Sequence, residues 1–370
     1  MFVAWRDLRF AKGRFALMGA VVVLITLLVG LLSGLTSGLA RENVSAITGL
    51  PATRLAFAVP AGDQKVSFTD SRLPESAWRA WRGRPGVTSA DPLGIRTTNA
   101  AVGERTAAVS VFGVEPGGRL APGAPAGALG RGRVVLTEKA AEELGGLTAG
   151  STLRTGALEL TVGAVSGTAS YSHTPVVWMD LDDWQRLGNP GTPGAAGSPT
   201  GTSATVVALS GGGAVDWAAG DRASASKSRT LDEALGAIGS YQAENGSLQL
   251  MRGFLFAISA LVIGAFFTVW TIQRSGDIAV LKALGASTPY LLKDALGQAV
   301  VMLALGTGLG TGLAAGIGAL ISGGAVPFVL DAATVLVPAA VMIVLGAVGA
   351  ALSIRRITAV DPLTALGSAR

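Results

Sequence analysis

The chain has no cysteine, a single histidine and few charged residues. Of its 370 residues only 14% are Asp, Glu, Lys or Arg, 49% are hydrophobic, and the mean hydropathy is +0.51. Soluble domains are typically about 25% charged, so the composition predicts a membrane protein. The absence of cysteine excludes disulfides, a thiol nucleophile and thiolate metal sites. With His173 as the one histidine, a multi-histidine metal site is also excluded.

Long runs without charge predict four membrane-spanning helices. The uncharged runs cover 15–40, 253–273, 295–330 and 332–354, and each holds the roughly 20 residues that a spanning helix needs. We place the spans at 15–39, 253–273, 295–321 and 333–354, with an outer turn at 322–332. A further uncharged run is rich in glycine and proline over 188–204. This composition indicates a flexible loop, which would divide the domain around it into two lobes.

The first span is interpreted as an uncleaved anchor. Its apolar run is about 25 residues long, whereas the apolar region of a signal peptide has roughly 7–15. Residues 1–14 are expected to form a cytoplasmic helix at the membrane interface, although a basic topology signal alone is compatible with the same residues. The pattern alternates apolar and basic side chains: Phe2, Trp5 and Leu8 with Arg6, Arg9 and Lys12.

The basic residues predict the orientation. Residues 1–14, the loop 274–294 and the tail 355–370 are rich in Lys and Arg, whereas the turn 322–332 has none. The positive-inside rule therefore places both termini and this loop in the cytoplasm. Residues 40–252 then form an extracytoplasmic domain with 19 basic and 19 acidic residues. The net charge of +5 is thus a topology signal, and nucleic acid binding is excluded.

The 40–252 segment is predicted to be an α+β domain. Short runs rich in Val, Leu, Phe and Thr predict strands, at 54–59, 65–69, 107–114, 133–137, 158–165, 175–179 and 204–209. Helices are expected at 73–82, 138–144 and 180–187, with Thr137 as the cap of the second. Thr230 and Glu233 fit a capping box. This box predicts a stalk helix over 231–252 that continues into the second span.

Glycines recur every four residues in two spans. One set is Gly30, Gly34 and Gly38, and the other is Gly308, Gly312 and Gly316. Such faces allow close helix packing, either between subunits or within one chain. The spans hold no ionisable residue, and this disfavours an ion-coupled transporter.

The cytoplasmic loop is the most informative segment. It predicts a short helix with an apolar stripe of Ile278, Leu281 and Leu284, ended by Gly285. Ser287 and Pro289 then favour the start of a second helix. An exposed amphipathic helix here indicates a partner groove, unless the stripe packs on the ends of its own spans.

This loop resembles that of the MacB/FtsX-type ABC transporter permeases, which include the lipoprotein-release and macrolide-export permeases. The similar motif is DIAVLKALGAS at 277–287, where Asp277 replaces the usual Glu. The tail RRITAVDPLTAL at 355–366 and the domain segments 109–116, 132–151 and 162–165 are also similar. The layout of one span, a large domain and three further spans fits the same family.

The resemblance implies a coupling helix that docks on a separate ATPase subunit. The residues implied are Asp277, Ile278, Val280, Leu281, Lys282, Ala283, Leu284 and Gly285. ATP and Mg²⁺ would bind to the ATPase, because this chain lacks the glycine-rich phosphate loop with its Lys. The glycines at 306–312 lie inside a span, so they indicate helix packing. The resemblance thus implies a non-catalytic subunit of the bacterial plasma membrane, which dimerises with a second permease subunit as a homo- or heterodimer.

Other candidate residues favour structural roles. His173 is predicted to lie in a loop. A single histidine there favours a surface or hydrogen-bonded side chain over a catalytic one. Asp180, Asp182 and Asp183 lack calcium-loop spacing and fit a helix N-terminus. Trp78 and Trp81 are predicted to pack in the core as part of an amphipathic helix. The alternative is a contact with a lipid or a peptide.

Three functions remain open at this point. The first is ATP-driven export or extraction of a lipid, lipoprotein, peptide or drug. The second is an FtsX-like transmitter that regulates a cell-wall hydrolase without transport. The third is a membrane-anchored sensor, which the coupling motif disfavours. Membrane lipids and an extracytoplasmic protein are further expected partners.

Overall fold

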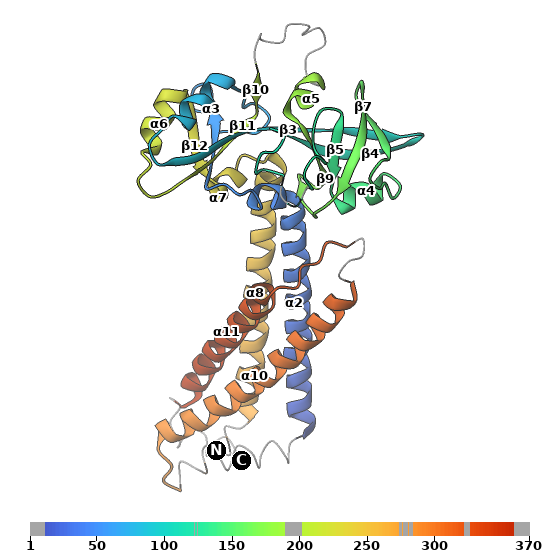
Figure 1. The fold of residues 1–370 in the computed structure, drawn as a ribbon. Helices are drawn as coiled ribbons and strands as arrows, with labels where there is room; N and C mark the ends of the chain where they lie inside the picture. The colour runs from blue at the N-terminus through green and yellow to red at the C-terminus, as the bar shows by residue number, and fades with distance from the viewer. Residues whose placement is uncertain are drawn as a thin grey trace. The chain divides into compact units, whose positions relative to one another are not determined.

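The computed structural model (Figure 1) describes residues 12–121, 123, 125–188, 202–273, 276, 280, 284–321 and 326–358. These residues form two compact units. Ala40–Asn245 make up the first unit, called here the 40–245 domain, and the residues before and after it make up the second. Most of the predicted interfacial helix, the tail and the glycine-rich loop lie outside the described residues.

The second unit contains two whole long helices and most of two others, α2 and α8, whose ends belong to the 40–245 domain. They are α2 (Lys12–Thr48), α8 (Gly239–Gln273), α10 (Thr288–Ile321) and α11 (Ala332–Thr358). Each contains a segment long and apolar enough to cross a membrane. Their shared core includes Phe267, Leu303 and Met342, while many leucines point outward. Outward-facing leucines fit helices whose surroundings are lipid.

Ten strands form the main sheet of the 40–245 domain, in the order β12-β1-β11-β3-β4-β9-β5-β7-β6 with β8 beside β9. A small second sheet pairs β2 (Leu73–Pro74) with β10 (Ser203–Ala204). The strands of the main sheet are β1 (Arg54–Ala58), β3 (Val87–Val102), β4 (Arg105–Val114), β5 (Arg133–Leu136), β6 (Thr152–Thr155), β7 (Leu158–Val165), β8 (Ser170–Tyr171), β9 (Thr174–Asp180), β11 (Val206–Gly211) and β12 (Ser226–Thr230).

Strand β3 connects the two ends of this sheet. Its first part pairs with β11, its second part with β4, and its end also with β6 through Ala100 and Ala101. The β6 pairing closes β3, β4, β9, β5, β7 and β6 into a ring. Pro92 is tolerated because its partner is Val207 of β11, and the β4 pairing starts only at Leu93. A proline without an amide hydrogen fits a strand position that has one neighbour.

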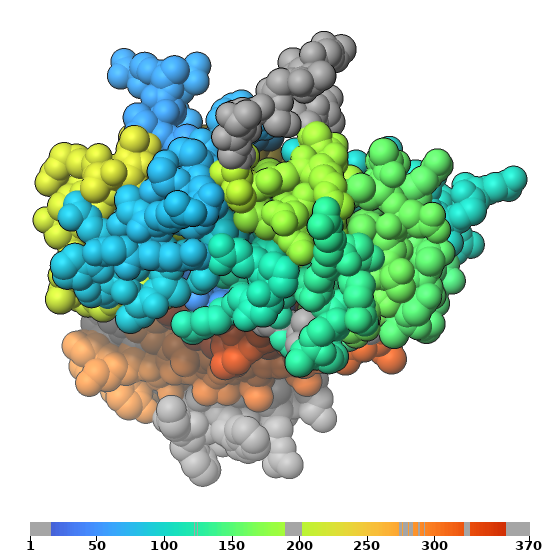
Figure 2. Space-filling model, turned by 45° about the horizontal axis from the view of Figure 1, so that its top comes forward, coloured from blue at the N-terminus to red at the C-terminus, as the bar shows by residue number. Residues whose placement is uncertain are grey.

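Two hydrophobic cores flank the sheet, because alternate residues of a strand face opposite sides. Val177 and Met179 of β9 join one core, and Val176 and Trp178 join the other. The first core is covered by α3 (Glu75–Arg82), α4 (Glu138–Glu143), α5 (Leu181–Arg186) and α6 (Trp217–Ser224). The second core takes in the end of α2 and helix α7 (Leu231–Leu235). Figure 2 shows α3 and α6 (blue and yellow) at one end of the domain and β5 to β7 (green) at the other.

Most predicted strands are confirmed, but the one at 65–69 is wrong. The structure has no strand there; instead Phe68 is buried and its amide donates to the carbonyl of Ala237. Pattern reasoning also missed β3, β6 and β12. The reason is clearest for β3, which contains proline, glycine, aspartate and asparagine, the residues that usually indicate turns.

The predicted stalk helix over 231–252 is wrong at its start. The capping box is confirmed, since Thr230 and Glu233 exchange hydrogen bonds of 3.0 and 3.2 Å. However, the helix ends at Leu235, and α8 begins only at Gly239. Gly236 follows α7, and Ala237 and Ile238 turn into the second core. Burial of these two side chains favours the break over a continuous helix.

Candidate functional site: the helix-to-domain junction and the 274–294 loop

The ends of α2 and α8 meet the β8–β9 turn in a hydrogen-bonded cluster within the 40–245 domain, which we call the junction. Asn43 of α2 is 1% exposed. Its Nδ2 lies 3.1 Å from His173 Nε2 and 3.4 Å from Glu244 Oε2. Its Oδ1 accepts a 2.7 Å bond from Ser240 Oγ of α8. The junction thereby links both helices to one turn of the sheet.

The turn at the junction has a strained backbone. Ser172 and His173 connect the paired residues Tyr171 and Thr174, and both have positive φ, at 49° and 63°. Two-residue hairpins of this type favour Asn and Gly, because other side chains resist positive φ. The strain persists only where the surroundings hold it. Here the Ser172 amide donates to the Asn43 carbonyl at 2.9 Å, and its hydroxyl lies 2.8 Å from Ser240 Oγ.

Charged groups complete the junction. His173 Nε2 lies 2.8 Å from Glu244 Oε2, an ion pair when the imidazole is protonated. Also on α2, Glu42 Oε1 lies 2.5 Å from Lys139 Nζ. Ser45 exchanges two hydrogen bonds with the backbone of Ser170. A shift of either helix end therefore acts directly on β8, β9 and α4.

The junction was missed by sequence reasoning, apart from His173. That residue was predicted to be at the surface or hydrogen-bonded, and it is a half-buried hydrogen-bonded side chain. The one usable signal was Ser-His in a tight turn where Asn-Gly is usual. Asn43 and Glu244 gave no signal, because their partners are distant in sequence.

The predicted coupling loop is described only in part. Leu284 donates its amide to the Val280 carbonyl at 3.0 Å, which is a helical hydrogen bond. Gly285 has φ of 96°, the conformation expected after a helix end. Ser287 directly precedes α10 and Pro289 lies in its first turn. Val280 is 56% and Leu284 79% exposed. Asp277, Ile278, Leu281, Lys282 and Ala283 lie outside the described residues.

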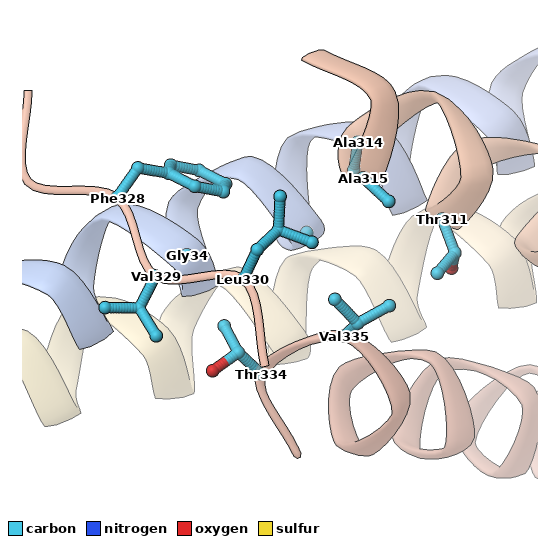
Figure 3. Close-up of a pocket in the computed structure, with 10 residues that line it drawn as sticks. Gly34, Thr311, Ala314, Ala315, Phe328, Val329, Leu330, Thr334 and Val335 are labelled. Carbon is cyan, nitrogen blue, oxygen red and sulfur yellow. The ribbon is translucent and has the colours of Figure 1, made fainter. Parts of the chain in front are cut away.

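The glycine face of α2 packs against the same chain. A Cβ added to Gly30 would lie 2.8 Å from Ala314 of α10, and one on Gly34 only 2.2 Å from the Phe328 ring. At Gly38 it would lie 2.0 Å from the Pro327 carbonyl oxygen. Figure 3 shows Phe328 and its neighbours extended along α2 beside Gly34. The Val329 amide donates to the Gly34 carbonyl at 3.2 Å.

The glycine face predicted on α10 makes no such contact. No described residue lies within 4 Å of a Cβ added to Gly308, Gly312 or Gly316. The neighbouring Gly306 and Gly310 face α2 instead. A Cβ added to Gly306 would lie 2.8 Å from Val22, and one added to Gly310 would lie 2.6 Å from the Val23 carbonyl oxygen. The role of Gly308, Gly312 and Gly316 in helix packing therefore stays a prediction.

The acidic cluster before α5 is structural. Asp180 accepts the amide of Asp182 at 2.9 Å, as a helix cap. Burial raises the pKa of Asp180, a shift that this amide bond opposes. Asp183 is 1% exposed, accepts the Gly132 amide and pairs with Arg186. Among the described residues no group of three or more His, Cys, Asp or Glu could hold a metal.

The tryptophans of α3 belong to the core, as the sequence favoured. Trp78 and Trp81 are 2% and 0% exposed. The indole of Trp81 donates to Ser226 Oγ at 3.1 Å.

Thr137 stands at the cap position of α4, but the predicted cap bond is wrong. Its hydroxyl donates to the Val176 carbonyl instead.

The fold defines a class, that of multi-pass membrane proteins with a large α/β domain between the first and second of four spans. Residues 17–221 match the MacB-like periplasmic core domain, and residues 250–362 match the FtsX-like permease C-terminal family. The chain therefore belongs to the MacB/FtsX family of ABC transporter permeases. The 40–245 domain is its extracytoplasmic domain.

Similar proteins carry related names. The chain is 26% identical to an uncharacterized ABC transporter permease of Mycobacterium tuberculosis, over 99% of both chains. It is 38% identical to the "Putative hemin transport system permease protein HrtB" of Staphylococcus haemolyticus over 130 residues. That second match spans 35% of this chain and 37% of the relative.

Two solved structures similar to this chain are a periplasmic region and an extracellular domain. The periplasmic region of MacB from Actinobacillus actinomycetemcomitans is 14% identical, with a TM-score of 0.34 over 50% of this chain and 92% of its own. The extracellular domain of the ABC-type transporter YknZ from Gram-positive bacteria is also 14% identical. Its TM-score is 0.32, over 50% of this chain and 92% of its own.

Proposed function

We propose that this permease couples ATP hydrolysis by a separate ATPase subunit to movement of its extracytoplasmic domain. One observation carries the proposal. Helices α2 and α8 each run without a break from a candidate span to the junction. A continuous helix transmits displacement along its axis, because its backbone hydrogen bonds resist extension. The junction would receive that displacement at the β8–β9 turn.

In this proposal the permease sits in the bacterial plasma membrane with both termini in the cytoplasm. The basic residues of the 1–14, 274–294 and 355–370 segments support this orientation. The loop that contains Val280 and Leu284 then faces the ATPase. Their exposed apolar side chains supply a docking surface. ATP and Mg²⁺ bind to the ATPase, and this chain itself is non-catalytic.

Co-purification of the tagged permease with its ATPase tests the docking surface. We expect Leu281→Asp with Leu284→Asp to abolish the complex, because a carboxylate cannot be buried unpaired in an apolar groove. Val326→Asp is the matched control, since Val326 is 47% exposed in the turn that we place outside. Retention of the ATPase by the double variant would refute the assignment of the coupling helix.

The cargo is the second part of the proposal. We favour export or extraction of a lipid, lipoprotein, peptide or drug by a dimer of permease subunits, with membrane lipids around it. The relative named for hemin transport adds hemin to the compounds worth assaying. The alternative is an FtsX-like transmitter that regulates a cell-wall hydrolase through an extracytoplasmic protein partner. ATP-dependent movement of a compound by the reconstituted complex would exclude this alternative.

A further inference from the structure

A cavity of about 380 Å³ opens in the extracytoplasmic domain, beside the middle of β3. On one edge of β3, the β11 pairing ends at Leu93 and the β6 pairing starts at Ala100. Between these two pairings, that edge has no partner strand among the described residues. The Thr205 hydroxyl accepts a hydrogen bond from the Ile95 amide and donates one to the Ile95 carbonyl. The next residues of β3, Arg96 and Thr97, border the cavity. The cavity thus arises from the topology of the sheet.

Two arginines, Arg72 and Arg96, line this cavity. Arg96 of β3 lies 4.7 Å from the ring centroid of Trp184 and donates to the Trp184 carbonyl at 3.2 Å. Arg72 enters from the segment before β2. Among the described residues neither guanidinium forms an ion pair. Burial and the charge of Arg72 lower the pKa of Arg96, and two unpaired cations in one cavity attract an anion.

Aromatic side chains also line the cavity. Phe68 and Tyr171 pack edge to face at 5.7 Å and line the cavity together with Ile95. Tyr171 is 7% exposed, and burial raises the pKa of its hydroxyl above the usual range, so the group remains a neutral donor. Among the described lining residues Asp70 is the one carboxylate. The described lining therefore carries a net positive charge beside an apolar surface.

We propose that this cavity binds an amphipathic organic anion, with its acidic group on Arg72 and Arg96 and its apolar body against Phe68 and Tyr171. Three features select this class of ligand. The volume lies within the range of small-molecule sites, about 300–1,000 Å³. Guanidinium groups match the planar geometry of a carboxylate or the oxygens of a phosphate. The aromatic wall discriminates against an inorganic ion. The inference does not depend on the ATPase or on the cargo.

Calorimetric titration of the full-length permease in phosphatidylcholine nanodiscs tests the proposal. The probe is naphthoate, which carries a carboxylate on an aromatic body, and the neutral comparison is naphthalenemethanol. We expect naphthoate to bind and the neutral compound to bind at least tenfold more weakly. Arg72→Gln should weaken naphthoate binding about tenfold, the ratio that about 1.4 kcal/mol of binding free energy produces. This variant is safe for folding, because Arg72 is exposed and holds no partner among the described residues.

Further variants separate charge from packing. Arg96→Gln should weaken binding as Arg72→Gln does, whereas Arg96→Lys keeps the charge but loses the planar guanidinium over Trp184, so it should weaken binding less than Arg96→Gln. Arg79→Gln is the matched control, because Arg79 is an exposed arginine on α3 outside the cavity. Binding that is equal for naphthoate and its neutral analogue would overturn the proposal. So would binding that is unchanged in Arg72→Gln and Arg96→Gln, or lost to the same extent in Arg79→Gln.

Discussion

Replacing Asn43 by alanine tests the junction most directly. The substitution removes side-chain contacts of Asn43 with His173, Glu244 and Ser240, at 3.1, 3.4 and 2.7 Å. A hydrogen bond contributes about 0.5–1.5 kcal/mol net, and a partner left buried without one costs more. We therefore expect Asn43→Ala to lower the free energy of unfolding of the extracytoplasmic domain by about 2–4 kcal/mol.

The loss is measurable by thermal unfolding of the purified permease in detergent. For a domain of this size each kcal/mol shifts the midpoint by about 2–4 °C, so the variant should unfold roughly 10 °C lower. Tryptophan fluorescence reports on this domain, since Trp78, Trp81, Trp178 and Trp184 are buried in its cores. Asn99→Ala is the matched control, because Asn99 is exposed on β3.

A double-mutant cycle sharpens the test. If Asn43 and Glu244 act in one network, Asn43→Ala and Glu244→Ala should show a coupling energy above about 0.5 kcal/mol. Equal midpoints for Asn43→Ala and Asn99→Ala, or additive effects in the cycle, would refute the claim that the junction stabilises the domain. The proposal that helix displacement reaches the extracytoplasmic domain through the junction would then lose its support. The fold and the family assignment would be unaffected.

Three further predictions concern packing and charge. Gly94→Ala should destabilise the extracytoplasmic domain by about 1–3 kcal/mol, because the new Cβ would lie 2.4 Å from the Trp184 ring; chemical denaturation measures this loss. Burial raises the pKa of Asp180, so its ionised form is disfavoured in the fold and stability is lost as pH rises through the folded pKa. Asp180→Asn should therefore raise the unfolding temperature at neutral pH, with a difference that disappears in acid. Gly34→Ala should lower the unfolding temperature of the membrane unit, whereas Gly312→Ala, which adds a Cβ with no described residue within 4 Å, should not.

The sequence predicted the spans and the overall layout because both depend on local composition. A run without charge identifies a span by itself, and the capping box at Thr230 and Glu233 is complete within four residues. The tryptophans of α3 were likewise placed in the core from their helical spacing alone. Each of these signals is read within one short window of the chain.

The rest depends on contacts between distant residues. Strand β3 contains Pro92 and Gly94, which indicate a turn when read locally. Both are accommodated by partners elsewhere, Pro92 by Val207 and Gly94 by Gly113 and the Trp184 ring. The junction and the cavity follow the same rule, since no window of the sequence holds Asn43 with Glu244 or Arg72 with Arg96. The helix break at Gly236 was missed because burial of the next two residues decides it.

The pairing of β1 has a consequence for how the chain matures. Arg54 lies near the start of the domain, yet it pairs with Leu209 of β11 and Thr230 of β12. Such non-local pairing folds slowly, because a long loop must close before any contact forms. During synthesis the first strand therefore waits outside the membrane until almost the whole domain has been exported, just before α8 is made. Over that interval the apolar residues of β1 lack their partner strands, so β1 is expected to be among the last strands to join the sheet.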